Sequence, residues 1–95
     1  MNLREFKAWL MKQDRNAKLW DLKVYGCPLE VWYNSTHEKE VRVGHNEWVF
    51  NELGAKEHPL SPKLKAFVKK VDAGKESWGN YTIQELLDII KEVQA

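Results

Sequence analysis

The chain has 95 residues, of which 43% are hydrophobic and 31% are charged, so it can bury one core and remain well solvated. This length excludes an enzyme with separate cofactor and substrate domains, and the apolar content argues against a disordered chain. The formal net charge of +1 provides no overall field that would direct the protein to nucleic acid or to an anionic membrane. We therefore expect a single globular domain over residues 1–95.

The first expected element is a helix over residues 2–13. Asn2 and Glu5 have the spacing of a capping pair, in which the Asn side chain accepts a hydrogen bond from a free amide at the helix start. Leu3, Phe6 and Leu10 recur at helical spacing and predict one buried face.

A region with a period of two follows, and it predicts an antiparallel meander with strands over residues 19–25, 29–34 and 40–44. The tripeptide Gly26-Cys27-Pro28 has the composition of a turn between the first two strands. Residues 47–51 predict a fourth strand from their Trp-Val-Phe sequence, and a short helix that ends at Gly54 is the alternative.

Two helices complete the prediction. Ser61 followed by Pro62 is typical of a helix start, and the apolar spacing that follows predicts a helix over residues 62–73, with Gly74 as its stop. Thr82 and Glu85 form a capping box for the last helix. The predicted fold class is α+β: an antiparallel three- to four-stranded meander with helices packed on one face, in the order α-β-β-β-(β)-α-α.

The sequence favours a cytoplasmic protein without membrane contact. Its single cysteine cannot form an internal disulfide, which is typical of a reducing compartment. The amphipathic first ten residues do not resemble a signal peptide, and no apolar run approaches the length of about 18 residues that spans a bilayer.

Catalytic and metal-binding residues are not indicated, so we expect no enzyme, no metal and no cofactor. Cys27 and His45 are the only pair that the meander would bring together, and Cys27 in a turn before proline lacks the neighbours that activate a thiolate. The histidines and the cysteine are not grouped in the close pairs that structural zinc sites use.

The helix over residues 62–73 has a row of lysines. Its members are Lys63, Lys65, Lys69 and Lys70, with no acidic residue before Asp72. Such a row is usually a solvated face, and the functional alternative is contact with nucleic-acid phosphates, which clustered lysines neutralise without reading sequence. The absence of arginine from this helix weakens any recognition of specific bases.

The outer face of the predicted sheet is the second candidate surface. The period of two places Tyr25, Trp32, Lys23 and Arg42 on the side away from the helices. A tryptophan in that position needs a cover, which could be the chain's own loop around Trp78, a second copy of the chain or a foreign protein. Stacking of RNA bases on the two aromatic rings is the nucleic-acid version of this hypothesis.

From these features we expect a small, non-enzymatic, cytosolic interaction or regulatory module that binds a protein partner through Tyr25, Trp32 and Arg42. If a second copy of the chain covers this surface, the protein forms a homodimer. The alternative is a nucleic-acid-binding module that uses the lysine-rich helix over 62–73 and the outer face of the sheet, including Lys23.

Overall fold

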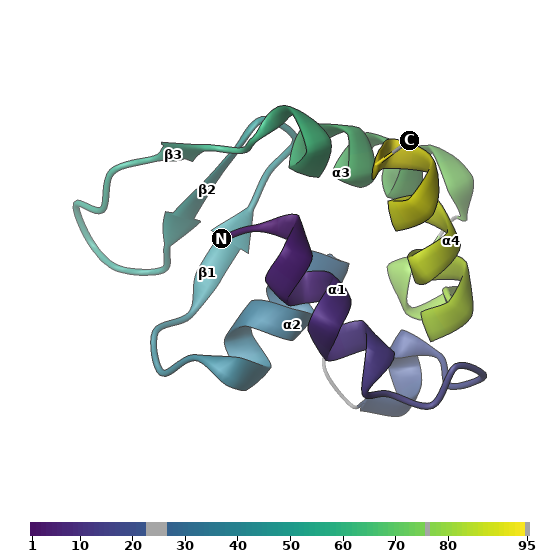
Figure 1. Ribbon diagram of the computed structural model, residues 1–95. Coiled ribbons are helices and arrows are strands. Elements are labelled where there is room, and N and C mark those ends of the chain that lie inside the picture. Colours follow the sequence, from purple (N-terminus) through teal and green to yellow (C-terminus); the bar gives the residue numbers. More distant parts are fainter. Residues whose placement is uncertain (23–26, 76, 95) are drawn as a thin grey trace.

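The computed structural model describes residues 1–22, 27–75 and 77–94, which form four α-helices, two short 3-10 helices and one three-stranded antiparallel sheet (Figure 1). The α+β class is therefore confirmed. In chain order the elements are α1 (Leu3–Met11), η1 (Leu19–Leu22), α2 (Pro28–Thr36), β1 (Val41–Val43), β2 (Glu47–Phe50), β3 (His58–Pro59), α3 (Pro62–Gly74), η2 (Trp78–Asn80) and α4 (Ile83–Gln94). None of the helices formed by these residues has the length and apolar character needed to cross a membrane.

Helix α1 begins as its sequence predicts. The Asn2 side chain accepts a hydrogen bond from the Glu5 amide at 2.8 Å, and the residues on the predicted apolar face, Leu3, Phe6 and Leu10, are buried. The cap and the apolar spacing act within one helical turn of each other, so the local sequence is sufficient to specify this element.

The first two predicted strands are wrong. Residues 29–34 belong to helix α2, and residues 19–22 form the 3-10 helix η1, while residues 23–26 lie outside the described part of the chain. The element order is therefore α-α-β-β-β-α-α when the 3-10 helices are left aside, and the predicted order α-β-β-β-(β)-α-α is corrected.

Helix α2 contains the signals of a helix as well as those of a strand. Pro28 occupies its first turn. Backbone amides in the first turn have no acceptor within the helix, so the missing N–H of proline costs no helical hydrogen bond there. At its end, Thr36 Oγ1 donates to Trp32 O at 2.9 Å, and the His37 amide donates to Tyr33 O at 3.0 Å. In so short a segment, apolar residues at 29, 31 and 33 suit a strand, while burial at 28, 29, 31 and 32 suits a helix, so packing against the core decides.

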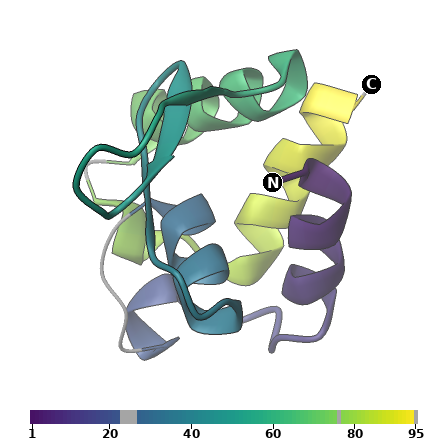
Figure 2. The same ribbon diagram turned by 90° about the vertical axis from the view of Figure 1, so that its left-hand side faces the viewer.

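The sheet is formed later in the chain than predicted. The strands expected over 40–44 and 47–51 are confirmed as β1 and β2, and the short-helix alternative for the second is wrong. They pair antiparallel, with Val43 opposite Trp48, and β3 pairs with the other edge of β2, with His58 opposite Trp48. The third strand, β3, lies in a segment for which the sequence predicts no strand. As Figure 2 shows, this small sheet stands beside the helices rather than beneath all of them.

Helices α3 and α4 start at their predicted caps. The Leu64 amide donates to Ser61 Oγ at 3.3 Å at the start of α3. At the start of α4 the capping box is complete, because the Glu85 amide donates to Thr82 Oγ1 at 3.1 Å and the Thr82 amide donates to Glu85 Oε1 at 3.0 Å.

The core lies among the helices. Phe6 of α1 is fully buried, with its ring centroid 5.4 Å from that of Trp32 of α2 and 5.3 Å from that of Phe67 of α3. On the sheet, Val41 is buried and Arg42 is exposed, so one face of β1 is covered by the domain, as its alternating pattern predicts. The lysine-rich helix α3 buries its apolar face in this core, and its lysine side chains are exposed.

Candidate anion-binding groove

The predicted protein-binding surface is not assembled. Trp32 is only 3% exposed and packs into the core from α2, which corrects its expected place on an open sheet face. Tyr25 and Lys23 lie outside the described residues. Arg42 is exposed on β1, as expected, but the described residues do not bring it together with an exposed Trp32.

Cys27 is buried and unsuited to nucleophilic catalysis. Burial raises the pKa of its thiol from 9.0 to about 12, so the thiolate is scarce at neutral pH. His45, the base that the meander would have placed near it, instead has Nε2 3.0 Å from Asp72 Oδ2. Across residues 1–22, 27–75 and 77–94, no group of three or more His, Cys, Asp or Glu side chains is placed to hold a metal ion.

The four predicted lysines of α3 are divided between two sides of the helix. Lys65 and Lys69 are one turn apart and line a groove beside the β1–β2 turn. Lys70 lies on the side of α4, where its Nζ is 2.8 Å from Glu92 Oε2, and Lys63, seven residues earlier, shares that side. Only one pair of lysines therefore belongs to the groove.

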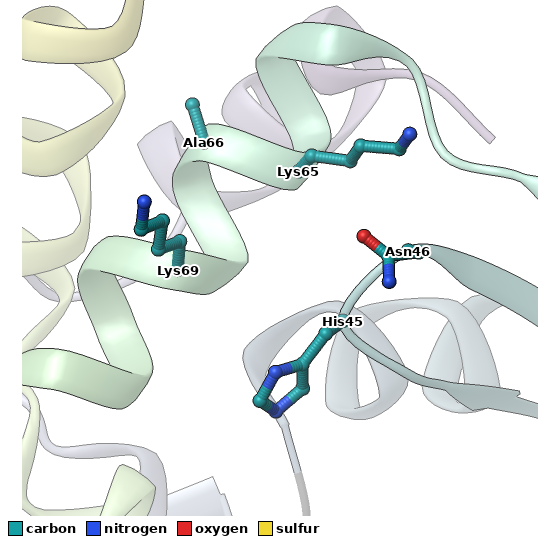
Figure 3. A pocket seen from close by; sticks show the side chains of 5 residues that line it. All are labelled: His45, Asn46, Lys65, Ala66 and Lys69. Atoms are coloured by element: carbon teal, nitrogen blue, oxygen red, sulfur yellow. The ribbon is translucent and has the colours of Figure 1, made fainter.

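The groove runs between α3 and the β1–β2 turn and has a volume of about 420 Å³. Figure 3 shows Lys65 and Lys69 extending from successive turns of α3, with the Asn46 amide pointing towards the helix from the opposite side. Ala66, the residue after Lys65, contributes only a methyl group to the lining. The imidazole of His45 points away from Lys65.

The fold holds the turn in a fixed position. The Gly44 amide donates to Glu47 O at 2.8 Å, which closes a hairpin loop of two residues, and both of them, His45 and Asn46, line the groove. The Leu60 amide donates to Asn46 O at 2.9 Å and ties the turn to the segment that leads into α3. The two walls are therefore linked directly by backbone hydrogen bonds.

Asp72 connects the same turn to α3 and to η2. Its Oδ2 lies 3.0 Å from His45 Nε2, and its Oδ1 accepts a hydrogen bond of 2.7 Å from Trp78 Nε1. Both oxygens of the Asp72 carboxylate are therefore engaged. Within the described part of the chain, neither Lys65 nor Lys69 has a carboxylate within 4.0 Å, so their charges remain available to a ligand.

This arrangement suits an anion with several oxygen atoms. Two ammonium groups provide charge without directional demands, and the Asn46 amide supplies hydrogen-bonding groups on the opposite wall, next to His45, whose Nε2 is held by Asp72. Sequence reasoning identified the lysines and missed these two partners. The signal was present in the turn Gly44-His45-Asn46, but only the pairing of β1 with β2 places that turn beside α3.

Comparison of the chain with protein-family models, with curated proteins and with solved structures returns no match.

Proposed function

We propose that the protein is a small, non-enzymatic, cytosolic binding module whose groove between α3 and the β1–β2 turn holds phosphate groups of a nucleic-acid backbone. The observation that carries this proposal is that Lys65 and Lys69 line one groove with His45 and Asn46 and lack carboxylate partners among the described residues.

The chemistry of the groove favours the backbone over the bases. Lysine binds phosphate as a point charge and releases condensed counterions, and this accounts for most affinity that does not depend on sequence. The groove has no arginine to make the bidentate contacts that identify guanine. We therefore expect weak binding that is similar for different sequences, in the range of about 1 to 100 μM for non-specific contact.

A protein partner was the expectation based on Trp32, and the burial of this side chain removes its main support. The described residues that line the groove include no large aliphatic side chain, whereas a stable protein interface usually has a buried aromatic or aliphatic centre. The nucleic-acid interpretation therefore accounts for more of the observed geometry.

The proposal is tested by fluorescence anisotropy with labelled single-stranded and double-stranded oligonucleotides. In the double variant Lys65→Gln/Lys69→Gln both charges of the groove are lost, and we expect affinity to fall about tenfold or more, because each phosphate contact contributes a counterion term.

The matched control is Lys63→Gln/Lys70→Gln, which removes the same charge from the other side of the same helix. It should retain affinity within about twofold, since only the general field changes. Equal losses in the two variants would show that overall charge binds the nucleic acid rather than the groove. An absence of binding by the wild type would reject the proposal and favour a protein ligand.

A further inference from the structure

A second surface lies between α1 and α4, away from the lysine groove. Its lining includes Lys7 from α1, Arg15 from the turn after α1 and Lys91 from α4, with Asp88 as the one carboxylate among the described lining residues, and its volume is about 340 Å³. Two apolar side chains, Met11 and Leu87, also line it. We call this surface the α1–α4 cleft.

The cations of the cleft are held apart from carboxylates. Lys7 Nζ donates to Gln94 Oε1 at 3.4 Å, and Arg15 Nη1 donates to Gln84 Oε1 at 3.2 Å. These are neutral amide partners, so the charges of the two residues are oriented but not neutralised. Met11, four residues along the chain from each of them, is 54% exposed.

The opposite end of the molecule presents a complementary feature. The β2–β3 connection turns through residues 52–55, where the Ala55 amide donates to Glu52 O at 3.3 Å and Gly54 has φ = +78°. This combination is typical of a type II turn, which needs a positive φ at its third residue. Leu53 occupies the second position and is fully exposed.

The charge around this turn is acidic. Residues 38–57 contain five acidic and three basic side chains. Glu52 directly precedes the exposed leucine and lies 3.8 Å from Lys39 Nζ, so the acidic excess comes from the other carboxylates of this stretch. The cleft has the reverse character, with three basic residues against one acidic residue. Both surfaces have an apolar centre with a charged border, and the borders have opposite signs.

We propose that the β2–β3 turn of one copy inserts Leu53 into the α1–α4 cleft of a second copy, so that the chains associate head to tail. The turn and α4 lie at opposite ends of a molecule whose longest extent is 38 Å (Figure 1), so a single chain cannot fill its own cleft. A contact of this kind is heterologous: each copy uses two different surfaces, and growth beyond the dimer follows unless a ring closes. The small contact area predicts weak association, with a dissociation constant of about 0.1 to 1 mM.

Sedimentation velocity over a range of concentrations up to about 1 mM tests the association, since the proposed contact is populated only there. The wild type should exceed its monomer mass of 11.2 kDa at high concentration, and added salt should reduce the effect. Leu53→Asp and Met11→Asp should each remain monomeric. Both positions are exposed, and far-ultraviolet circular dichroism verifies that the fold is kept.

Mixing the two variants is the decisive measurement. Leu53→Asp retains an intact cleft and Met11→Asp retains an intact turn, so the mixture has one working contact and should form a dimer that grows no further. The matched controls are Ala55→Asp in the same turn region and Ala8→Asp on α1, which add the same charge without removing Leu53 or Met11. Both controls should associate more strongly than the two test variants.

Three results would overturn the proposal. The first is a wild type that stays monomeric at the highest concentration. The second is a mixture of the two variants that stays monomeric while the wild type associates, which would indicate a symmetric contact elsewhere. The third is association that survives both Leu53→Asp and Met11→Asp. None of these results bears on binding of nucleic acid by the α3 groove, which uses other residues.

Discussion

At the end of α3, Gly74 lies against the hydroxyl group of Tyr81, which donates a hydrogen bond to Val71 O at 2.8 Å and accepts one from the Lys75 amide at 3.0 Å. A Cβ atom at position 74 would collide with that hydroxyl oxygen. The glycine that the sequence marked as a helix stop is therefore needed because a buried tyrosine approaches the backbone there.

Replacement of Gly74 by alanine should lower the free energy of unfolding by about 1 to 3 kcal/mol, because the added methyl group displaces the Tyr81 ring. Urea denaturation of Gly74→Ala, Tyr81→Phe and the double variant measures the coupling. In the Tyr81→Phe background, which lacks the hydroxyl, the alanine should cost much less. An identical cost in both backgrounds would contradict this packing.

The buried thiol of Cys27 makes the stability of the folded protein depend on pH. Because burial raises its pKa from 9.0 to about 12, the folded state favours the neutral thiol. The associated stability is complete below pH 9 and is lost as the pH rises from 9 towards 12.

Relative to Cys27→Ala, the wild type should lose about 1.4 kcal/mol of unfolding free energy between pH 8 and pH 10. Denaturation of both proteins at each pH provides the comparison, and tyrosine and lysine titrations cancel between them. Parallel pH profiles would show that the thiol is solvated in the folded protein. Rapid alkylation of native Cys27 at neutral pH would lead to the same conclusion.

Among the elements, those with local signals are predicted well from the sequence. The caps at Asn2, Ser61 and Thr82 each join residues three positions apart, and all three are found as hydrogen bonds. Helix α2 has no such decisive signal, because Cys27 makes no side-chain capping hydrogen bond and its apolar positions fit both periods. Its β-branched and aromatic residues favour a strand intrinsically, and packing of Trp32 against Phe6 overrides that preference.

The burial of Trp32 gives the prediction for this element. Trp32→Ala should cost about 3 to 5 kcal/mol in unfolding free energy, because it empties the space between α2 and Phe6. Trp78→Ala is the matched control, since Trp78 is 37% exposed, and it should cost about 1 kcal/mol for one hydrogen bond to Asp72. Similar melting temperatures for wild type and Trp32→Ala would indicate that Trp32 is exposed, as the predicted strand over residues 29–34 would have placed it.

For the whole molecule, the uneven distribution of charge matters more than its total. Residues 59–76 contain five basic and two acidic side chains, whereas residues 26–58 contain three and six. The sequence alone identified the lysines of the first stretch as candidates. It could not show that α3 turns Lys65 and Lys69 towards the β1–β2 turn and Lys70 towards Glu92, because that division depends on how α3 packs on its neighbours.

The same limit applies to the partners of the lysines. His45 and Asn46 are about twenty residues from them in sequence, and strand pairing brings the turn to α3. The contact between His45 and Asp72 likewise replaces the pairing of His45 with Cys27 that a different sheet would have produced. The periodic pattern of a single sequence indicates local elements and does not show which distant segments pair.

The salt dependence of nucleic-acid binding tests the central claim most directly. With two lysines on the phosphates, the logarithm of the binding constant for duplex DNA should fall against the logarithm of salt concentration with a slope of about −2. In Lys65→Gln/Lys69→Gln the slope should approach zero, while Lys63→Gln/Lys70→Gln should keep the slope of the wild type. A slope unchanged by loss of Lys65 and Lys69, or affinity that does not respond to salt, would contradict the assignment of the groove as a phosphate site.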